Sequence, residues 1–274
     1  VYDGLMKISD GIRKLYENNY CEFLALSSVG PAFFAMVKNE IQKEKCKEVM
    51  EQLNLKVFES SICNTKYIVV NSTESDCFWK SENTGRSFRN RPTSKYITDE
   101  IDLLNVKNNK CIDIGCGGGR YSKYLKSKGA NVLTLDKYPE MFDHSSNINF
   151  IKGLMNNIPV MDNSYYLALS IGVIHNSVTV EEYEKSLIEI YRILQKGGYA
   201  LISTFTDDVI SSDLTKTGNN TYLIDNRPPM VLLNKEQILN YIHNIGFNLI
   251  KVVDEHITDV GSGNRYVYTI LIQK

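Results

Sequence analysis

The chain has 274 residues, of which 43% are hydrophobic and 23% are charged, and its formal net charge at neutral pH is −1. A chain of this size can bury a large core and is long enough for two domains. The balanced charge excludes a general attraction to nucleic acid or to an anionic membrane. The longest apolar stretch, residues 24–37, is interrupted by serine, glycine and proline, so it is not a membrane span. We expect a cytoplasmic protein with no nucleic-acid or membrane partner.

The six cysteines form no Cys-x-x-Cys pair and show no Cys/His spacing that suits zinc. In a chain of this length they indicate reduced thiols. The sequence therefore predicts neither a disulfide framework nor a metal site.

The first 76 residues predict the order helix, strand, helix, strand. Residues 23–37 are apolar around a Ser-Ser-Val-Gly-Pro turn, residues 40–53 have a helical composition, and residues 65–70 are β-branched and aromatic. Residues 71–95 are polar and irregular. We therefore expect a smaller α+β domain over residues 1–76 and a second domain over residues 77–274.

From residue 110 onward, short apolar strands alternate with amphipathic helices, which predicts an α/β fold with a mostly parallel sheet covered on both faces. The expected strands are 110–115, 131–136, 148–153, 166–171, 199–204, 248–255 and 266–273. The expected helices are 119–128, the helix that a Thr179–Glu182 capping box opens and Gly197-Gly198 ends, and the helix that runs from an Asn234–Gln237 box to Gly246.

A glycine-rich turn follows the first of these strands, within the sequence Cys-Ile-Asp-Ile-Gly-Cys-Gly-Gly-Gly-Arg-Tyr of residues 111–121. Such a turn lets a ligand lie against bare backbone amides at the crevice of an open α/β sheet. A dinucleotide-binding loop requires a third glycine three residues after the second, and Arg120 or Ser122 stands there. This spacing disfavours a nicotinamide-dependent oxidoreductase, which stays an alternative.

The segment resembles the first motif of the class I S-adenosylmethionine-dependent methyltransferases. This resemblance implies that Gly115, Cys116, Gly117 and Gly119 run beside the homocysteine portion of the cofactor, and that Asp113 helps to hold its amino group. Asp136 ends the second strand, 21 residues after Gly115, where a carboxylate can accept hydrogen bonds from both ribose hydroxyls.

The resemblance extends over residues 109–274 with its motifs in order. Residues 150–159 match the segment that borders the adenine ring, but Leu154 stands where many members have an acidic residue. We therefore expect Leu154 and Met155 to wall the base by apolar contact, with Lys137 and Ile171 as further cofactor contacts. The resemblance implies a seven-stranded Rossmann-like sheet whose last strand is antiparallel beside the fifth.

Methyl transfer from a sulfonium needs an aligned, desolvated acceptor and at most one proton acceptor. His175, which leaves the fourth strand at the crevice, is the candidate base. Residues 77–108 are expected to cap the site, with Arg86 pairing with the methionyl carboxylate, and residues 205–233 to form a lid. The expected reaction is methyl transfer to an oxygen or nitrogen of a small-molecule acceptor.

Residues 24–37 resemble the third motif of the GHMP small-molecule kinases, and residues 1–76 resemble that family's C-terminal domain. The ATP-binding half is absent and the chain begins with valine, so we expect the natural chain to extend upstream. Two accounts are open: a bifunctional kinase–methyltransferase, which would suggest a sugar or another hydroxylated metabolite as the acceptor, or a remnant that serves as a scaffold. A non-catalytic cofactor-binding module of a larger kinase is the alternative function.

Overall fold

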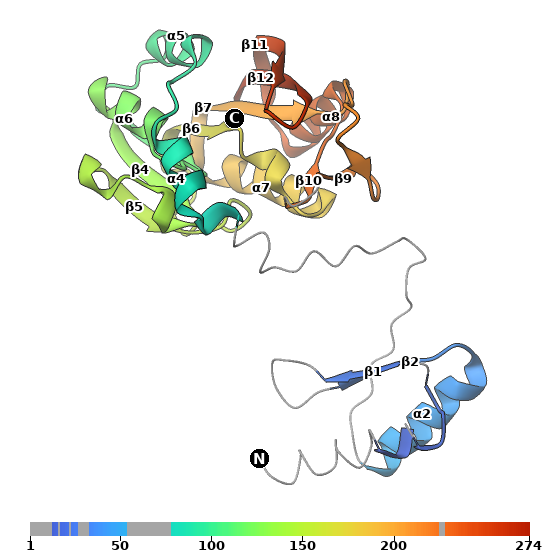
Figure 1. The fold of residues 1–274 in the computed structure, drawn as a ribbon. Coiled ribbons are helices and arrows are strands. Elements are labelled where there is room, and N and C mark those ends of the chain that lie inside the picture. The colour runs from blue at the N-terminus through green and yellow to red at the C-terminus, as the bar shows by residue number, and fades with distance from the viewer. Residues whose placement is uncertain (1–12, 16, 22, 27–32, 54–77, 225–227) are drawn as a thin grey trace. The chain divides into compact units, whose positions relative to one another are not determined.

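The computed structural model describes residues 13–15, 17–21, 23–26, 33–53, 78–224 and 228–274. The chain divides into two compact units, residues 1–64 and 65–274, which are described separately (Figure 1). The domain junction predicted at residues 76 and 77 lies outside the described residues.

The first unit contains an antiparallel pair of short strands followed by a helix. Strands β1 (Phe23–Leu26) and β2 (Phe33–Met36) pair, and α2 (Glu40–Gln52) begins where the Asn39 side chain accepts a hydrogen bond from the Gln42 amide at 2.9 Å. The α2 helix confirms the helix predicted over residues 40–53, whereas the predicted order had a single strand before it and the structure has two. The strand predicted over residues 65–70 lies outside the described part of the chain.

The second unit is built on a seven-stranded sheet in the order β11-β12-β7-β6-β3-β4-β5 (Figure 1). Five neighbouring strands are parallel, and β12 is antiparallel to both β7 and β11. The strands are β3 (Lys110–Ile114), β4 (Asn131–Asp136), β5 (Asn149–Lys152), β6 (Tyr165–Ile171), β7 (Leu194–Thr206), β11 (Asn248–Asp259) and β12 (Asn264–Gln273). All seven predicted strands are present, and the Rossmann-like order and antiparallel last strand are confirmed.

Helices cover both faces of the sheet, which agrees with the consecutive buried residues of β3 and β6. The helices are α4 (Glu82–Arg89), α5 (Lys95–Leu103), α6 (Arg120–Ser127), α7 (Val180–Ile193) and α8 (Lys235–Ile245), with 3-10 turns η1 (Pro139–Met141), η2 (His144–Ser146) and η3 (Ile174–Asn176). In β3, Ile112 and Ile114 join the core cluster that includes residues of α7 and α8, while Cys111 joins the cluster of α5 and α6.

The α7 helix ends earlier than the glycine pair predicted. It stops at Ile193, and β7 begins at Leu194, so Gly197 and Gly198 lie inside the strand. The reason is tertiary pairing: the Gly197 amide donates to the Lys274 carbonyl and the Lys274 amide donates to the Gly198 carbonyl, each at 3.0 Å. These bonds pair Gly197 and Gly198 with the end of the chain after β12, so the two glycines do not cap the helix.

The predicted capping boxes are present in full at α8 and in part at α7. Asn234 and Gln237 make both reciprocal side-chain bonds. At α7, Thr179 accepts from the Glu182 amide, but the Glu182 carboxylate accepts from the Val178 amide at 2.8 Å instead of closing the box on Thr179.

The segment predicted as a lid forms a small antiparallel sheet of β8 (Thr215–Lys216), β9 (Thr221–Leu223) and β10 (Met230–Val231), with its own apolar cluster. A buried ion pair ties this segment to β12. Arg265 is fully buried, and its guanidinium contacts both carboxylate oxygens of Asp213 at 2.6 and 3.1 Å. Arg265 thereby holds the pKa of Asp213 well below its ordinary value.

Replacing Arg265 with Met is expected to lower the free energy of unfolding by about 3 kcal/mol, because it leaves Asp213 with the hydrogen bond from Ser211 but without its cationic partner. Urea denaturation measures this change. The double variant R265M/D213L removes both charges and should recover most of the loss, since a buried ion pair can often be replaced by apolar groups at little cost. Equal destabilisation of the single and double variants would show that the ion pair does not secure the segment.

Candidate functional site

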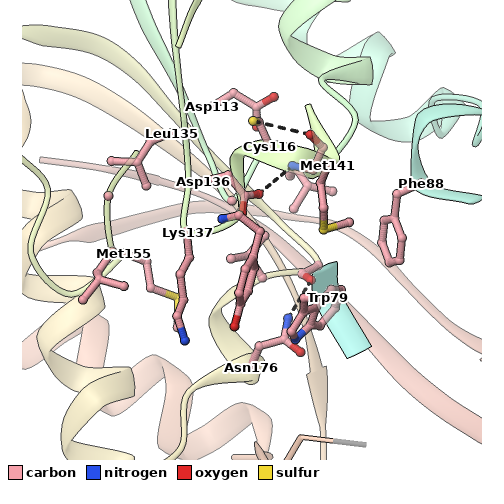
Figure 2. A pocket seen from close by; sticks show the side chains of 18 of the residues that line it. Trp79, Phe88, Asp113, Cys116, Leu135, Asp136, Lys137, Met141, Met155 and Asn176 are labelled. Atoms are coloured by element: carbon pink, nitrogen blue, oxygen red, sulfur yellow. Dashed lines mark hydrogen bonds between the residues drawn. The ribbon is translucent and has the colours of Figure 1, made fainter. Parts of the chain in front are cut away.

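A cavity of about 320 Å³ lies at the carboxyl ends of β3, β4 and β6 (Figure 2). The turn after β3 and residues that follow β4, β5 and β6 line it, together with residues of the segment before β3. The structure brings most of the predicted cofactor residues to this cavity: Asp113, Gly115, Cys116, Gly117, Asp136, Lys137, Leu154, Met155 and Ile171.

The glycine loop after β3 is fixed to the end of β4 by backbone hydrogen bonds. The amides of Gly115 and Cys116 both donate to the Leu135 carbonyl, at 2.7 and 3.1 Å. The Gly117 amide donates to Asp136 Oδ2 at 2.8 Å. The loop therefore presents its backbone at a set distance from the Asp136 carboxylate.

Asp136 is a buried carboxylate that accepts backbone hydrogen bonds on both oxygens. Besides the Gly117 bond, Oδ1 accepts from the Tyr138 amide at 2.9 Å. Burial raises the pKa of Asp136, and the amides of Tyr138, Gly117 and Lys137 oppose the rise. Because a carboxylate has about four acceptor sites, Asp136 keeps acceptor capacity for a further donor, such as a sugar hydroxyl.

Asp113 is the second buried carboxylate, with 3% of its surface exposed. It accepts a 2.5 Å hydrogen bond from Ser122 Oγ at the start of α6. Burial raises the pKa of Asp113 to about 6, and the negative charge of Asp136 adds to the rise. Two buried acidic groups in one cavity would be stabilised as carboxylates by a cationic ligand.

The absence of side chains at two loop glycines lets other elements approach. A Cβ atom at Gly118 would lie 2.5 Å from the Arg89 Cα and 2.9 Å from the Phe88 carbonyl oxygen, so the backbone of α4 rests directly on the loop. A Cβ at Gly115 would lie 2.3 Å from Val173 Cγ1. Arg89 Nη1 also donates to the Glu140 carbonyl at 3.1 Å. The segment predicted to cap the site therefore does contact the glycine loop.

Aromatic side chains form one wall of the cavity. Trp79 lies edge-on to Phe78 at 4.9 Å between ring centroids, tilted to Phe88 at 5.7 Å, and within 20° of parallel to Tyr138 at 6.5 Å. Trp79, Phe88 and Tyr138 line the cavity. We refer to Phe78, Trp79 and Phe88 as the aromatic cap.

The structure does not bring His175, the predicted base, to the cavity. Its ring is buried against Phe205 at 4.2 Å between centroids, and Nδ1 accepts a hydrogen bond from the Phe205 amide at 3.2 Å. Burial, helped by the charge of Arg265, lowers the pKa of His175 to about 3. Neighbouring residues of a 3-10 turn point about 120° apart, and the next residue, Asn176, lines the cavity instead.

Gly119 is placed differently from expectation: it is the N-cap of α6, with a φ of 77°, and is not among the residues that line the cavity. Arg86 belongs to α4, but its side chain lies outside the described part of the structure, so its predicted contact stays a prediction. Arg120 does line the cavity, with its Nη1 donating to the Pro92 carbonyl at 2.9 Å.

Several residues that line the cavity were not predicted as cofactor-binding or catalytic residues: Trp79, Phe88, Gly118, Arg120, Tyr138, Asn176, Glu182 and Pro228. Arg120 follows the glycine loop directly, and this position in the sequence could have predicted that it lines the cavity. The contribution of Trp79 and Phe88 depends on the docking of α4, which no local pattern encodes.

The described residues contain no group of three or more His, Cys, Asp or Glu side chains placed to hold a metal ion. In the same residues, no helix combines the length and the apolar character needed to cross a bilayer.

Comparisons with known proteins agree with this architecture. Residues 112–202 match the family described as a methyltransferase domain. The malonyl-(acyl-carrier protein) O-methyltransferase of Pectobacterium atrosepticum is 27% identical over 107 residues, which cover 36% of this chain and 40% of that protein. The matches span less than half the length of each curated relative.

Solved structures share the fold at low sequence identity. An S-adenosylmethionine-dependent methyltransferase of Methanosarcina mazei has a TM-score of 0.57 and 17% identity, covering 67% of this chain and 99% of that one. The 1,6-didemethyltoxoflavin-N1-methyltransferase of Burkholderia thailandensis, with bound S-adenosylhomocysteine, has a TM-score of 0.56 and 16% identity, covering 79% and 93%. The [4+2]-cyclase SpnF has a TM-score of 0.55 and 12% identity, covering 78% and 99%.

The sheet order and the glycine loop agree with the match of residues 112–202 to a methyltransferase domain. The cofactor that this match and the neighbour with bound S-adenosylhomocysteine imply is S-adenosylmethionine. The cyclase neighbour shows that the fold by itself does not fix the reaction.

Replacing Gly118 with Ala is expected to push α4 off the glycine loop, because the added Cβ would meet backbone atoms that cannot rotate away. Trp79 is the only tryptophan of the chain, so its emission maximum should move to longer wavelength as the aromatic cap becomes hydrated. Gly197→Ala is the matched control: it imposes an unfavourable positive φ but has open space around it, and should leave the emission unchanged. Unaltered emission in folded G118A would contradict the docking of α4.

Proposed function

We propose that the second unit transfers the methyl group of S-adenosylmethionine to an oxygen or nitrogen of a small-molecule acceptor. The observation that supports this most directly is the pair of buried carboxylates, Asp113 and Asp136, on either side of a glycine loop in one cavity. A cationic amino acid joined to a ribose matches both groups, whereas a dinucleotide carries phosphates that buried carboxylates would repel.

The residues of the cavity fit this cofactor. Asp113 would accept hydrogen bonds from its amino group, and the remaining acceptor capacity of Asp136 would serve the ribose. Leu154 and Met155 offer apolar contacts to the base, beside Lys137. For the methionyl carboxylate we propose Arg120, which lines the cavity and has further N–H donors besides the one bonded to Pro92.

When bound, the cofactor supplies an electrophilic methyl group on a sulfonium, so the chain itself must mainly orient the acceptor and exclude water. The aromatic cap and the α4 helix cover the cavity and exclude water. The side-chain amide of Asn176 is available to orient the acceptor. We assign His175 a structural role, since its ring nitrogen is bonded to the Phe205 backbone.

The first unit stays a predicted GHMP-kinase-like domain, and we propose that it belongs to a longer bifunctional kinase–methyltransferase chain. The hairpin of β1 and β2 and the α2 helix are compatible with this proposal. Under the alternative, the second unit is a non-catalytic cofactor-binding module. Isothermal calorimetry and turnover separate the cases: tight binding of S-adenosylmethionine without product across a broad acceptor panel favours the module, and binding of NAD instead favours an oxidoreductase.

Replacing Asp136 with Ala is expected to weaken binding of S-adenosylhomocysteine at least tenfold, about 1.4 kcal/mol or more, in calorimetry. Asp136 also holds the glycine loop, so the ribose contact needs its own measurement. Wild-type protein should prefer adenosine to 2′,3′-dideoxyadenosine, and D136A should lose that preference. If D136A discriminates between the two nucleosides as the wild type does, Asp136 does not bind the ribose.

Affinity for S-adenosylmethionine is expected to rise with pH through about 6, the raised pKa of Asp113 in the free protein. The cationic ligand favours the carboxylate, so below that pH binding must release a proton and weakens by up to about tenfold per pH unit. Asp113→Asn should flatten this dependence in calorimetry.

The stability of the ligand-free protein responds with the opposite sign. Because the pKa of Asp113 is higher in the folded than in the unfolded state, this group stabilises the fold at pH values below its ordinary pKa of about 3.9 and loses that contribution as pH rises through about 6. At low pH the protonated Asp113 stabilises the fold, so a fall in cofactor affinity there cannot be attributed to unfolding caused by this group. Identical pH profiles for wild type and D113N would contradict the assignment of Asp113.

A further inference from the structure

The part of the cavity that the proposed cofactor contacts leave unassigned is lined mainly by apolar and aromatic groups. Its apolar walls include Trp79 and Phe88 of the aromatic cap, Val178 of the loop after η3, and Pro228 of the lid segment, and its polar side chains include Asn176 and Glu182. In Figure 2, Trp79 and Asn176 are drawn at the end of the pocket away from Asp113. These walls offer little to a ligand that is covered with hydroxyl groups.

Trp79 packs among aromatic neighbours. It makes an edge-on contact with Phe78 and a tilted contact with Phe88, Tyr138 lies near-parallel to it at 6.5 Å between centroids, and the residue is only partly buried. A partly exposed indole is a surface on which a flat π-system can stack, at a favourable energy beyond the area it buries.

Asn176 lines the cavity and lies five residues after the end of β6 at Ile171. Its Nδ2 donates to the Gly172 carbonyl at 3.3 Å, which leaves Oδ1 as the hydrogen-bond acceptor of the side chain (Figure 2). Glu182, which also lines the cavity, already accepts one hydrogen bond on each carboxylate oxygen, from the Val178 amide at 2.8 Å and from Asn156 Nδ2 at 3.1 Å. Of these two side chains, Asn176 is the neutral acceptor for an O–H or N–H group.

We propose that the methyl acceptor is an uncharged, planar aromatic or heteroaromatic compound bearing an O–H or N–H group, which stacks on Trp79 and donates that hydrogen to Asn176 Oδ1. This inference rests on the proposed function and specifies its substrate class. A lone pair of the acceptor oxygen or nitrogen forms the new bond to carbon, the sulfur–carbon bond breaks with its electron pair going to sulfur, and the acceptor proton passes to water. Asn176 acts as a positioning residue.

Fluorescence of Trp79 tests the stacking without any need for turnover, because no other tryptophan contributes to the emission. With S-adenosylhomocysteine bound, catechol should quench the emission saturably, whereas its saturated counterpart cyclohexane-1,2-diol and glucose should not. Calorimetry on Trp79→Ala should show at least a tenfold loss of catechol affinity, with Trp79→Phe retaining most of it. Tyr166→Leu, which disrupts an aromatic pair of Tyr166 and Tyr199 among residues that do not line the cavity, is the matched control and should bind as wild type.

The Asn176 hydrogen bond is tested with catechol and its dimethyl ether, which has no hydrogen to donate. Asn176→Leu should lose affinity for catechol and leave affinity for the ether unchanged, a selective effect that general damage to the fold would not produce. Equal losses for the two ligands would overturn the role of Asn176. Stronger binding or faster methylation of glucose or cyclohexane-1,2-diol than of catechol would overturn the aromatic substrate class.

Calorimetry with S-adenosylhomocysteine alone separates this inference from the proposed function. If the cofactor product binds and the aromatic ligands do not, the substrate class is wrong and the methyltransferase proposal stands. If S-adenosylhomocysteine does not bind at all, the proposed function itself fails, whatever the aromatic ligands do.

Discussion

The site depends on one side chain that joins two strands at their carboxyl ends. Asp136 ends β4 and accepts the Gly117 amide of the loop after β3 and the Tyr138 amide of the turn that follows its own strand. The buried carboxylate thus sets the distance between the glycine loop and the turn that carries Tyr138. Burial raises the pKa of this carboxyl group, and the backbone amides that donate to it oppose the rise, which favours the ionised form.

Around this centre, the two sides of the cavity are assembled by different means. The glycine loop and β4 are joined by backbone bonds, which depend little on side-chain identity. The opposite side comes from the aromatic cap, which depends on α4 resting against Gly118 and on the bond from Arg89 to the Glu140 carbonyl. The backbone framework suits a cofactor that many related proteins share. The side chains of the cap suit an acceptor that differs from one protein to another.

The seven strands and both carboxylates could be predicted because each has a local signature. Asp136 follows an apolar strand at a distance from Gly115 that the resemblance gives, and Asp113 precedes the glycines within its strand. The end of α7 could not be predicted, because the glycine pair that usually stops a helix pairs with Lys274, more than 70 residues away. Local sequence does not contain that partner.

The prediction of His175 as the base shows a second limit of the sequence, the direction of a side chain. His175 and Asn176 are neighbours on one 3-10 turn, and only the direction of each side chain decides which one reaches the cavity. The apolar cluster of the lid segment includes Phe205 among its partly buried neighbours, and Phe205 holds the imidazole. The sequence predicts that a polar residue follows β6 at the crevice. It does not predict the direction of the side chain, which depends on packing against other elements.

The contact between Gly118 and α4 has an evolutionary consequence. The atoms that exclude a side chain at position 118 are the main-chain atoms of Phe88 and Arg89, so no exchange of side chain at 88 or 89 can make room for a larger residue there. Covariation between these positions would therefore be weak even though they touch. The path of the helix is constrained, while the side chains that it carries are free to diversify, and new substrate preferences can arise there without rebuilding the cofactor loop.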